Sequence, residues 1–160
     1  MISKKIIITG SFGVGKTSLF NQFIYQEFSD KYLTTIGAKV NSKTVVTEKG
    51  DVALLVWDIA GEITQHKVPD AYFLGTSGIV YVVDLTRPHT FTAVNSDMTF
   101  LKNILPDTAI VIVANKKDLV SDEQLIELAE KMPIIWDYIT SAKTGENVEK
   151  MFTDLALRIF

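Results

Sequence analysis

Apolar residues gather in short runs along this chain, separated by polar segments. Residues 6–8 are three consecutive isoleucines, which predicts a parallel strand buried by helices on both faces. Further apolar runs lie at residues 78–84, 109–114 and 134–139. Segments with helical periodicity stand between and after these runs. The alternation predicts an α/β layered sheet.

Two segments carry apolar residues at the spacing of a helix face. The first follows the isoleucine strand and contains Leu19, Phe20, Phe23 and Ile24. The second lies near the end of the chain and contains Val148, Met151, Phe152, Leu155 and Ile159. Residues 38–47 and 52–58 form two more predicted strands. The turn Lys49-Gly50-Asp51 between them predicts an antiparallel hairpin.

Composition limits the possible classes of protein. The chain has 160 residues, 47% apolar and 22% charged, which predicts one folded domain over residues 1–160. The net charge is -3 with no cluster of Lys and Arg, so we expect no nucleic-acid or anionic-lipid partner. The absence of cysteine excludes thiol chemistry and gives prenyl or palmitoyl groups no attachment point in this chain. Neither a signal peptide nor a membrane span is apparent, so we expect a cytoplasmic protein.

The isoleucine strand leads directly into residues 10–17, GSFGVGKT. This segment fits the phosphate-binding loop, in which four residues separate two glycines and Lys with Ser or Thr follows. Backbone N–H groups of such a loop, together with the positive helix N-terminus, hold phosphate oxygens. We expect Lys16 to reach the terminal phosphates and Thr17 to ligate Mg²⁺.

Residues 115–118, NKKD, follow a buried strand at the edge where α/β proteins bind ligands. The Asp118 carboxylate is suited to accept both neighbouring N–H groups on the edge of guanine, a pair that adenine lacks. We expect Asn115 to brace the loops and Lys116 to lie along the base. Another strand ends at Asp58, which is expected to bind Mg²⁺ through water, while Gly61 offers its N–H to the terminal phosphate.

With Thr35-Ile36-Gly37 and Ser141-Ala142-Lys143, these motifs resemble the Ras superfamily of small GTPases, most closely its Rab branch. The resemblance spans nearly the whole chain. It implies the Ras-like P-loop NTPase fold: a mostly parallel six-stranded sheet with one antiparallel strand and about five helices in three layers. The segments 71–75 and 78–86 also look like the Rab pattern after the second switch. Trp57 and Tyr72 either pack structurally or contact effector proteins.

The resemblance also implies roles for individual residues. Thr35 completes the magnesium shell with Thr17 and Asp58, Phe28 packs against the base, and the Ala142 N–H contacts the guanine carbonyl. Nucleotide contacts are expected from Phe12, Gly13, Val14, Gly15, Lys16, Thr17, Ser18, Phe28, Thr35, Gly61, Asn115, Lys116, Asp118, Ser141, Ala142 and Lys143. The expected catalytic residues are Lys16, Thr35, Gly61 and Glu62.

The chain departs from the family at Glu62, where a Gln usually orients the attacking water. A carboxylate cannot donate a hydrogen bond as an amide does, and its charge opposes the negative charge that develops nearby. We therefore expect slow hydrolysis. Gln65 and His66 are candidate substitutes in positioning water, or exposed residues without a role.

Phe12 replaces a small residue and either crowds the terminal phosphate and a partner's arginine finger or rests harmlessly on the second switch. Val40 replaces an aromatic effector contact of Rab proteins.

The sequence thus predicts a monomeric molecular switch that binds GTP or GDP with Mg²⁺. Effector, activating and exchange proteins would contact two loops, at residues 30–37 and 62–73. A binding-only adaptor held in the GTP form is the alternative. An adenine-nucleotide kinase would leave Asp118 without a purpose.

Overall fold

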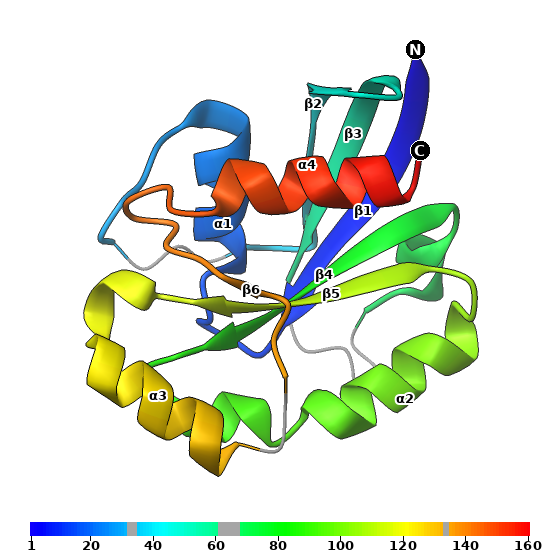
Figure 1. Ribbon diagram of the computed structural model, residues 1–160. Helices are drawn as coiled ribbons and strands as arrows, with labels where there is room; N and C mark the ends of the chain where they lie inside the picture. Colours follow the sequence, from blue (N-terminus) through cyan, green and yellow to red (C-terminus); the bar gives the residue numbers. More distant parts are fainter. Residues whose placement is uncertain (32–34, 61–67, 133–134) are drawn as a thin grey trace.

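The computed structural model describes residues 1–31, 35–60, 68–132 and 135–160. A six-stranded sheet crosses this part of the chain in the order β2-β3-β1-β4-β5-β6 (Figure 1). The strands are β1 (Ile2–Gly10), β2 (Ala38–Thr47), β3 (Gly50–Ile59), β4 (Thr76–Asp84), β5 (Ala109–Asn115) and β6 (Tyr138–Ile139). Neighbouring strands run parallel except β2, which pairs antiparallel with β3. The predicted sheet and its hairpin are confirmed.

Four α-helices accompany the sheet in the described residues. They are α1 (Lys16–Tyr25), α2 (Val94–Ile104), α3 (Asp122–Lys131) and α4 (Val148–Arg158). The described connections also contain three short 3₁₀ helices, η2 (Asp70–Phe73), η3 (Pro88–Phe91) and η4 (Lys117–Leu119). The described residues thus contain four α-helices, against a prediction of about five for the chain. The described part of the connection from β3 to β4 forms only the single 3₁₀ turn of η2.

The helices cover both faces of the sheet, which gives the predicted three layers. In Figure 1, α1 and α4 lie on one side of the sheet, and α2 and α3 on the other. Alternation along β1 supplies both cores: Ile6 and Ile8 pack with α1 and α4, whereas Ile7 packs with α2. Each of these isoleucines is 0% exposed. Burial on both faces explains why the strand is apolar at consecutive positions.

The last strand is shorter than predicted. The apolar run at 134–139 pairs with β5 only at Tyr138 and Ile139, and Ile134 lies outside the described residues. Ile135 is 89% exposed, and the Trp136 ring packs against Phe91 at 6.1 Å between centroids. Ile135 is thus exposed and Trp136 packs outside the sheet. A sequence pattern cannot distinguish such apolar residues from those of a strand.

The sheet fixes the position of the site. Parallel strands β1, β3, β4 and β5 end at Gly10, Ile59, Asp84 and Asn115, so these residues meet at one edge. No helix among the described residues has the length and apolar character needed to cross a membrane.

Candidate nucleotide-binding site

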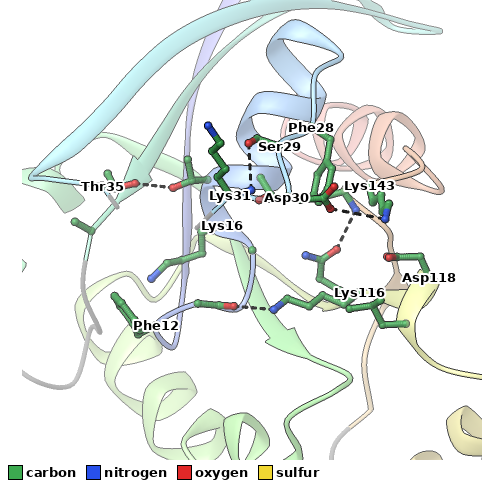
Figure 2. Close-up of a pocket in the computed structure, with 18 of the residues that line it drawn as sticks. Phe12, Lys16, Phe28, Ser29, Asp30, Lys31, Thr35, Lys116, Asp118 and Lys143 are labelled. Atoms are coloured by element: carbon green, nitrogen blue, oxygen red, sulfur yellow. Dashed lines mark hydrogen bonds and ion pairs between the residues drawn. The ribbon is translucent and has the colours of Figure 1, made fainter. Parts of the chain in front are cut away.

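A pocket of about 340 Å³ opens at this carboxyl edge. In Figure 2, Lys16 and Thr35 lie toward one end of it, and Phe28, Asp118 and Lys143 toward the other. Its lining residues are Phe12, Gly13, Gly15, Lys16, Thr17, Ser18, Phe28, Ser29, Asp30, Lys31, Thr35, Ile59, Ala60, Asn115, Lys116, Asp118, Leu119, Ala142 and Lys143. The described motifs, distant in sequence, are thus brought together. Val14, Asp58 and Ser141 are buried at 0% exposure and do not line the pocket.

The loop between β1 and α1 requires its glycines. Gly15 has φ +103°, and a Cβ there would lie 2.3 Å from Asn115 Nδ2. Gly10 has φ +144°, and a Cβ there would lie 2.3 Å from the Val82 carbonyl oxygen. Any side chain at either position would strain the backbone and collide with a neighbour. The close approach lets the loop fit between β4, β5 and the pocket.

The helix α1 begins at Lys16, so its N-terminus faces the pocket. Unpaired N–H groups and the helix dipole make this end attractive to anions. The Lys16 ammonium donates to the Gly10 carbonyl oxygen at 2.8 Å, and the residue is only 8% exposed. A cation and a helix N-terminus together suit a phosphate group.

Three oxygen-bearing side chains meet beside Lys16. Thr17 Oγ1 lies 2.6 Å from Thr35 Oγ1 and donates to Asp58 Oδ2 at 2.5 Å, and Thr35 Oγ1 lies 3.2 Å from the same carboxylate oxygen. The other oxygen, Asp58 Oδ1, is buried and has no hydrogen-bond partner among residues 1–31, 35–60, 68–132 and 135–160. Two hydroxyls and a carboxylate are hard oxygen ligands of the kind Mg²⁺ takes, so these residues fit a magnesium ion.

Burial raises the pKa of Asp58, opposed by hydrogen bonds from Thr17 and Thr35 and by the nearby charge of Lys16. A cation bound beside Asp58 would stabilise the charged form of this buried carboxylate. The electrostatics therefore agree with the oxygen geometry.

At the other end of the pocket, Asn115 connects three segments. Its Nδ2 donates to the Val14 carbonyl oxygen at 3.1 Å, while its Oδ1 accepts from Thr140 Oγ1 at 3.1 Å and from the Ala142 N–H at 3.2 Å. Ser141 Oγ donates to Asp118 Oδ1 at 2.8 Å, which orients that carboxylate. These hydrogen bonds connect the loops after β5 and β6 to each other and to the phosphate loop.

The pocket also has a rim of charged and aromatic side chains. Phe28 is 38% exposed, and the Lys143 ammonium lies 3.7 Å from Asp30 Oδ1 (Figure 2). Asp30, with Ser29 and Lys31, was not predicted as a lining residue. These residues carry no recognisable motif, and only the fold brings them to the pocket.

A second group that sequence reasoning missed lies behind the phosphate loop. Asp84, at the end of β4, is 0% exposed and accepts from Arg87 Nε and from the Lys116 ammonium, each at 2.8 Å. Thr86 donates to it through its N–H at 2.8 Å and its hydroxyl at 2.6 Å. Burial acts to raise the pKa of Asp84, but these hydrogen bonds outweigh it and lower the pKa. The signal in the sequence that could have indicated Asp84 was a charged residue at the end of a predicted buried strand.

Trp57 and Tyr72 pack on each other, with ring centroids 5.6 Å apart. The Lys5 ammonium lies 4.0 Å from the Trp57 ring centroid and donates to the Tyr72 and Leu74 carbonyl oxygens at 2.5 and 2.9 Å. The packing role of these rings is thus present, and their effector role stays a prediction. Gly61, Glu62, Gln65 and His66 lie outside the described residues.

Comparison with known proteins agrees with the motifs. The model of the Ras family matches residues 5–160. Ras-related protein SEC4 of Candida albicans, strain WO-1, is 35% identical over 158 residues, covering 95% of this chain and 75% of that protein. SEC4 of C. albicans strain SC5314 gives the same values. The resemblance to the Ras superfamily and its Rab branch is confirmed.

Proposed function

Because this chain belongs to the Ras family of small GTPases, we propose that it is a molecular switch that binds GTP or GDP with Mg²⁺ in this pocket and hydrolyses GTP slowly. GTP binding and GTPase activity follow from the family, and the slow rate is specific to this chain. The observation that carries the proposal is that the phosphate loop, the Asp118 loop and the hydroxyls of Thr17 and Thr35, which contact buried Asp58, meet at one pocket.

Each end of the pocket has a distinct task. The loop N–H groups and Lys16 bind the phosphates, since they combine hydrogen bonds with positive charge. Asp118 accepts the two N–H groups of guanine, while Ala142 and Lys143 line the same end. Thr17, Thr35 and Asp58 hold Mg²⁺, which supplies positive charge to the phosphate oxygens when bound.

The switch depends on Thr35, which lies in the first proposed partner loop, residues 30–37, shortly before β2. The Thr35 hydroxyl belongs to the oxygen cluster proposed to hold Mg²⁺ and lies 2.6 Å from the Thr17 hydroxyl. Loss of the terminal phosphate would remove the reason for Thr35 to stay there. Effector, activating and exchange proteins would contact residues 30–37 and residues 62–73. We place this monomeric switch in the cytoplasm.

Hydrolysis depends on Glu62 in this proposal. Glu62 accepts but cannot donate a hydrogen bond, and its negative charge opposes the developing charge on the phosphate. We expect Glu62→Gln to accelerate single-turnover GTP hydrolysis about tenfold or more, within the range that a positioned group contributes. Equal and brisk rates for wild type and Glu62→Gln would refute the slow-hydrolysis proposal.

A second candidate function, a GTP-bound adaptor, is favoured by Phe12. Its ring is 58% exposed at the phosphate end of the pocket. A bulky ring there obstructs a partner's arginine finger. Phe12→Gly should then gain stimulated hydrolysis with an activating protein, whereas an unchanged response would leave Phe12 without this role.

Competition between nucleotides tests the proposed function itself. Unlabelled GTP should displace bound fluorescent GDP at far lower concentration than ATP, because adenine cannot supply the donor pair for Asp118. Displacement by ATP at similar concentration would refute the guanine assignment.

A further inference from the structure

Three consecutive carbonyl groups of the phosphate loop accept hydrogen bonds from side chains at the end of β5 and in the loops after β4 and β5. Arg87 Nη2 donates to the Phe12 oxygen at 2.8 Å, the Lys116 ammonium to the Gly13 oxygen at 3.0 Å, and Asn115 Nδ2 to the Val14 oxygen at 3.1 Å. Figure 2 shows Lys116 extending toward the loop. Each donor comes from a different residue, so the three peptides are fixed separately.

Fixing a carbonyl also fixes the neighbouring N–H. Peptide groups are planar, and the described residues contain no cis peptide bond, so each C=O and the following N–H point in opposite directions. The N–H groups of Gly13, Val14 and Gly15 therefore point away from the side chains that hold the carbonyls. These are the donors that a phosphate-binding loop uses.

Arg87 is itself fixed at two points. Its Nε donates to buried Asp84 Oδ2 at 2.8 Å while its Nη2 reaches Phe12, so one planar guanidinium spans a carboxylate and the loop. The Arg87 N–H donates to the Asp84 carbonyl at 3.0 Å, and the Thr90 N–H donates to the Arg87 carbonyl at 2.9 Å. Asp84 also forms an ion pair with Lys116, so it anchors two of the three side chains that donate to the loop carbonyls.

We propose that Arg87, anchored by Asp84, is a positioning residue that holds the Phe12–Gly13 peptide with its N–H directed at the nucleotide phosphates. Arg87 acts through the loop and does not line the pocket. The proposal rests on nucleotide binding in this pocket. It requires the arginine fork, because a lysine ammonium has no rigid pair of separated donors to span Asp84 and Phe12.

The test is GDP dissociation from the full chain with Mg²⁺. Arg87→Ala should accelerate dissociation about tenfold, the effect of one hydrogen bond to a charged group. Arg158→Ala, which removes the only other arginine, is the matched control and should match wild type. Arg87→Lys, which preserves the charge and secures a folded comparison, should still release GDP several-fold faster than wild type.

A readout of phosphate recognition separates positioning from general damage to the fold. The ratio of GDP affinity to GMP affinity should fall in Arg87→Ala and stay constant in Arg158→Ala, because GMP lacks the β-phosphate. Equal losses for GDP and GMP, or wild-type release by Arg87→Lys, would overturn the proposal. Failure of wild type to bind GDP would instead refute the proposed function, so the two failures are distinguishable.

Discussion

At the scale of single residues, base selectivity depends on Asp118. Its carboxylate lines the pocket and accepts a hydrogen bond from Ser141 at 2.8 Å. The remaining acceptor capacity is available for the two N–H groups of guanine. Selectivity therefore depends on one side chain that is oriented by a second loop.

Asp118→Asn should reverse this selectivity. The amide presents a donor where guanine also presents one, so two charge-assisted hydrogen bonds of about 1.5–3 kcal/mol each are lost. Guanine-nucleotide affinity should fall at least about a hundredfold, while xanthine nucleotides, which carry an acceptor there, gain. Titration with GDP and XDP measures both, and an unchanged GDP affinity would contradict the role of Asp118.

Asp84 gives a prediction about pH. Its pKa is lowered in the folded protein from the usual 3.8, so its stabilising contribution is fully present above that value. The contribution is lost as pH falls through the lowered folded value. At pH 7, Asp84→Asn should reduce the free energy of unfolding by about 2 kcal/mol, since Arg87 and Lys116 lose their buried partner but remain partly exposed.

Urea unfolding of wild type and Asp84→Asn at pH 7 and at successively lower pH measures this contribution. The difference between the two proteins should shrink as pH falls below about 4. A difference that stays constant with pH would mean that the Asp84 charge does not contribute.

The residues that sequence reasoning found are those within contiguous motifs. Lys16 and Asp118 follow predicted strands and Asp58 ends one, so their meeting at one edge could be expected from topology. Arg87 could not, because its contact with Phe12 joins positions 75 residues apart and depends on the path of η3. Tertiary contacts of this kind leave no local pattern.

At the scale of elements, the turn from β1 into the phosphate loop is the most constrained junction. A Cβ on Gly10 would lie 2.3 Å from the Val82 carbonyl oxygen, in the backbone of β4. Backbone within a sheet cannot move aside as a flexible side chain does. The separation of β1 from β4 therefore requires glycine at this position.

Gly10→Ala should reduce the free energy of unfolding by about 3 kcal/mol or more, from the collision and the positive φ together. Gly75→Ala is the matched control: Gly75 also has positive φ, +70°, but its Cβ would meet nothing within 4 Å. It should lose only about 1 kcal/mol. Equal losses in urea unfolding would show that β4 yields to the added methyl group.

Element boundaries were predictable where turn residues mark them. The hairpin of β2 and β3 was placed within two residues at its turn because Gly50 stands beside charged residues. The short β6 was not, because exposed Ile135 and packed Trp136 extend an apolar run beyond the strand. Strand length at a sheet edge depends on neighbours that sequence does not specify.

At the scale of the whole molecule, two cores enclose the sheet and leave its carboxyl edge for the pocket. Phe23 of α1 stacks on Phe152 of α4, with ring centroids 3.9 Å apart, on one face. The α2 and α3 side of the sheet has its own core. Loops from both sides of the sheet meet at the pocket. The binding site is therefore formed by the whole folded domain and not by any single motif.

Binding of a guanine nucleotide in this pocket can be tested through the nucleotide that accompanies the purified protein. Mild purification with Mg²⁺, denaturation and chromatography of the released ligand should yield about one guanine nucleotide per chain. Abundant GTP would favour the adaptor, and GDP would favour turnover. Release of an adenine nucleotide would contradict guanine-nucleotide binding in this pocket. So would a protein that is purified without nucleotide and takes up no GDP with Mg²⁺.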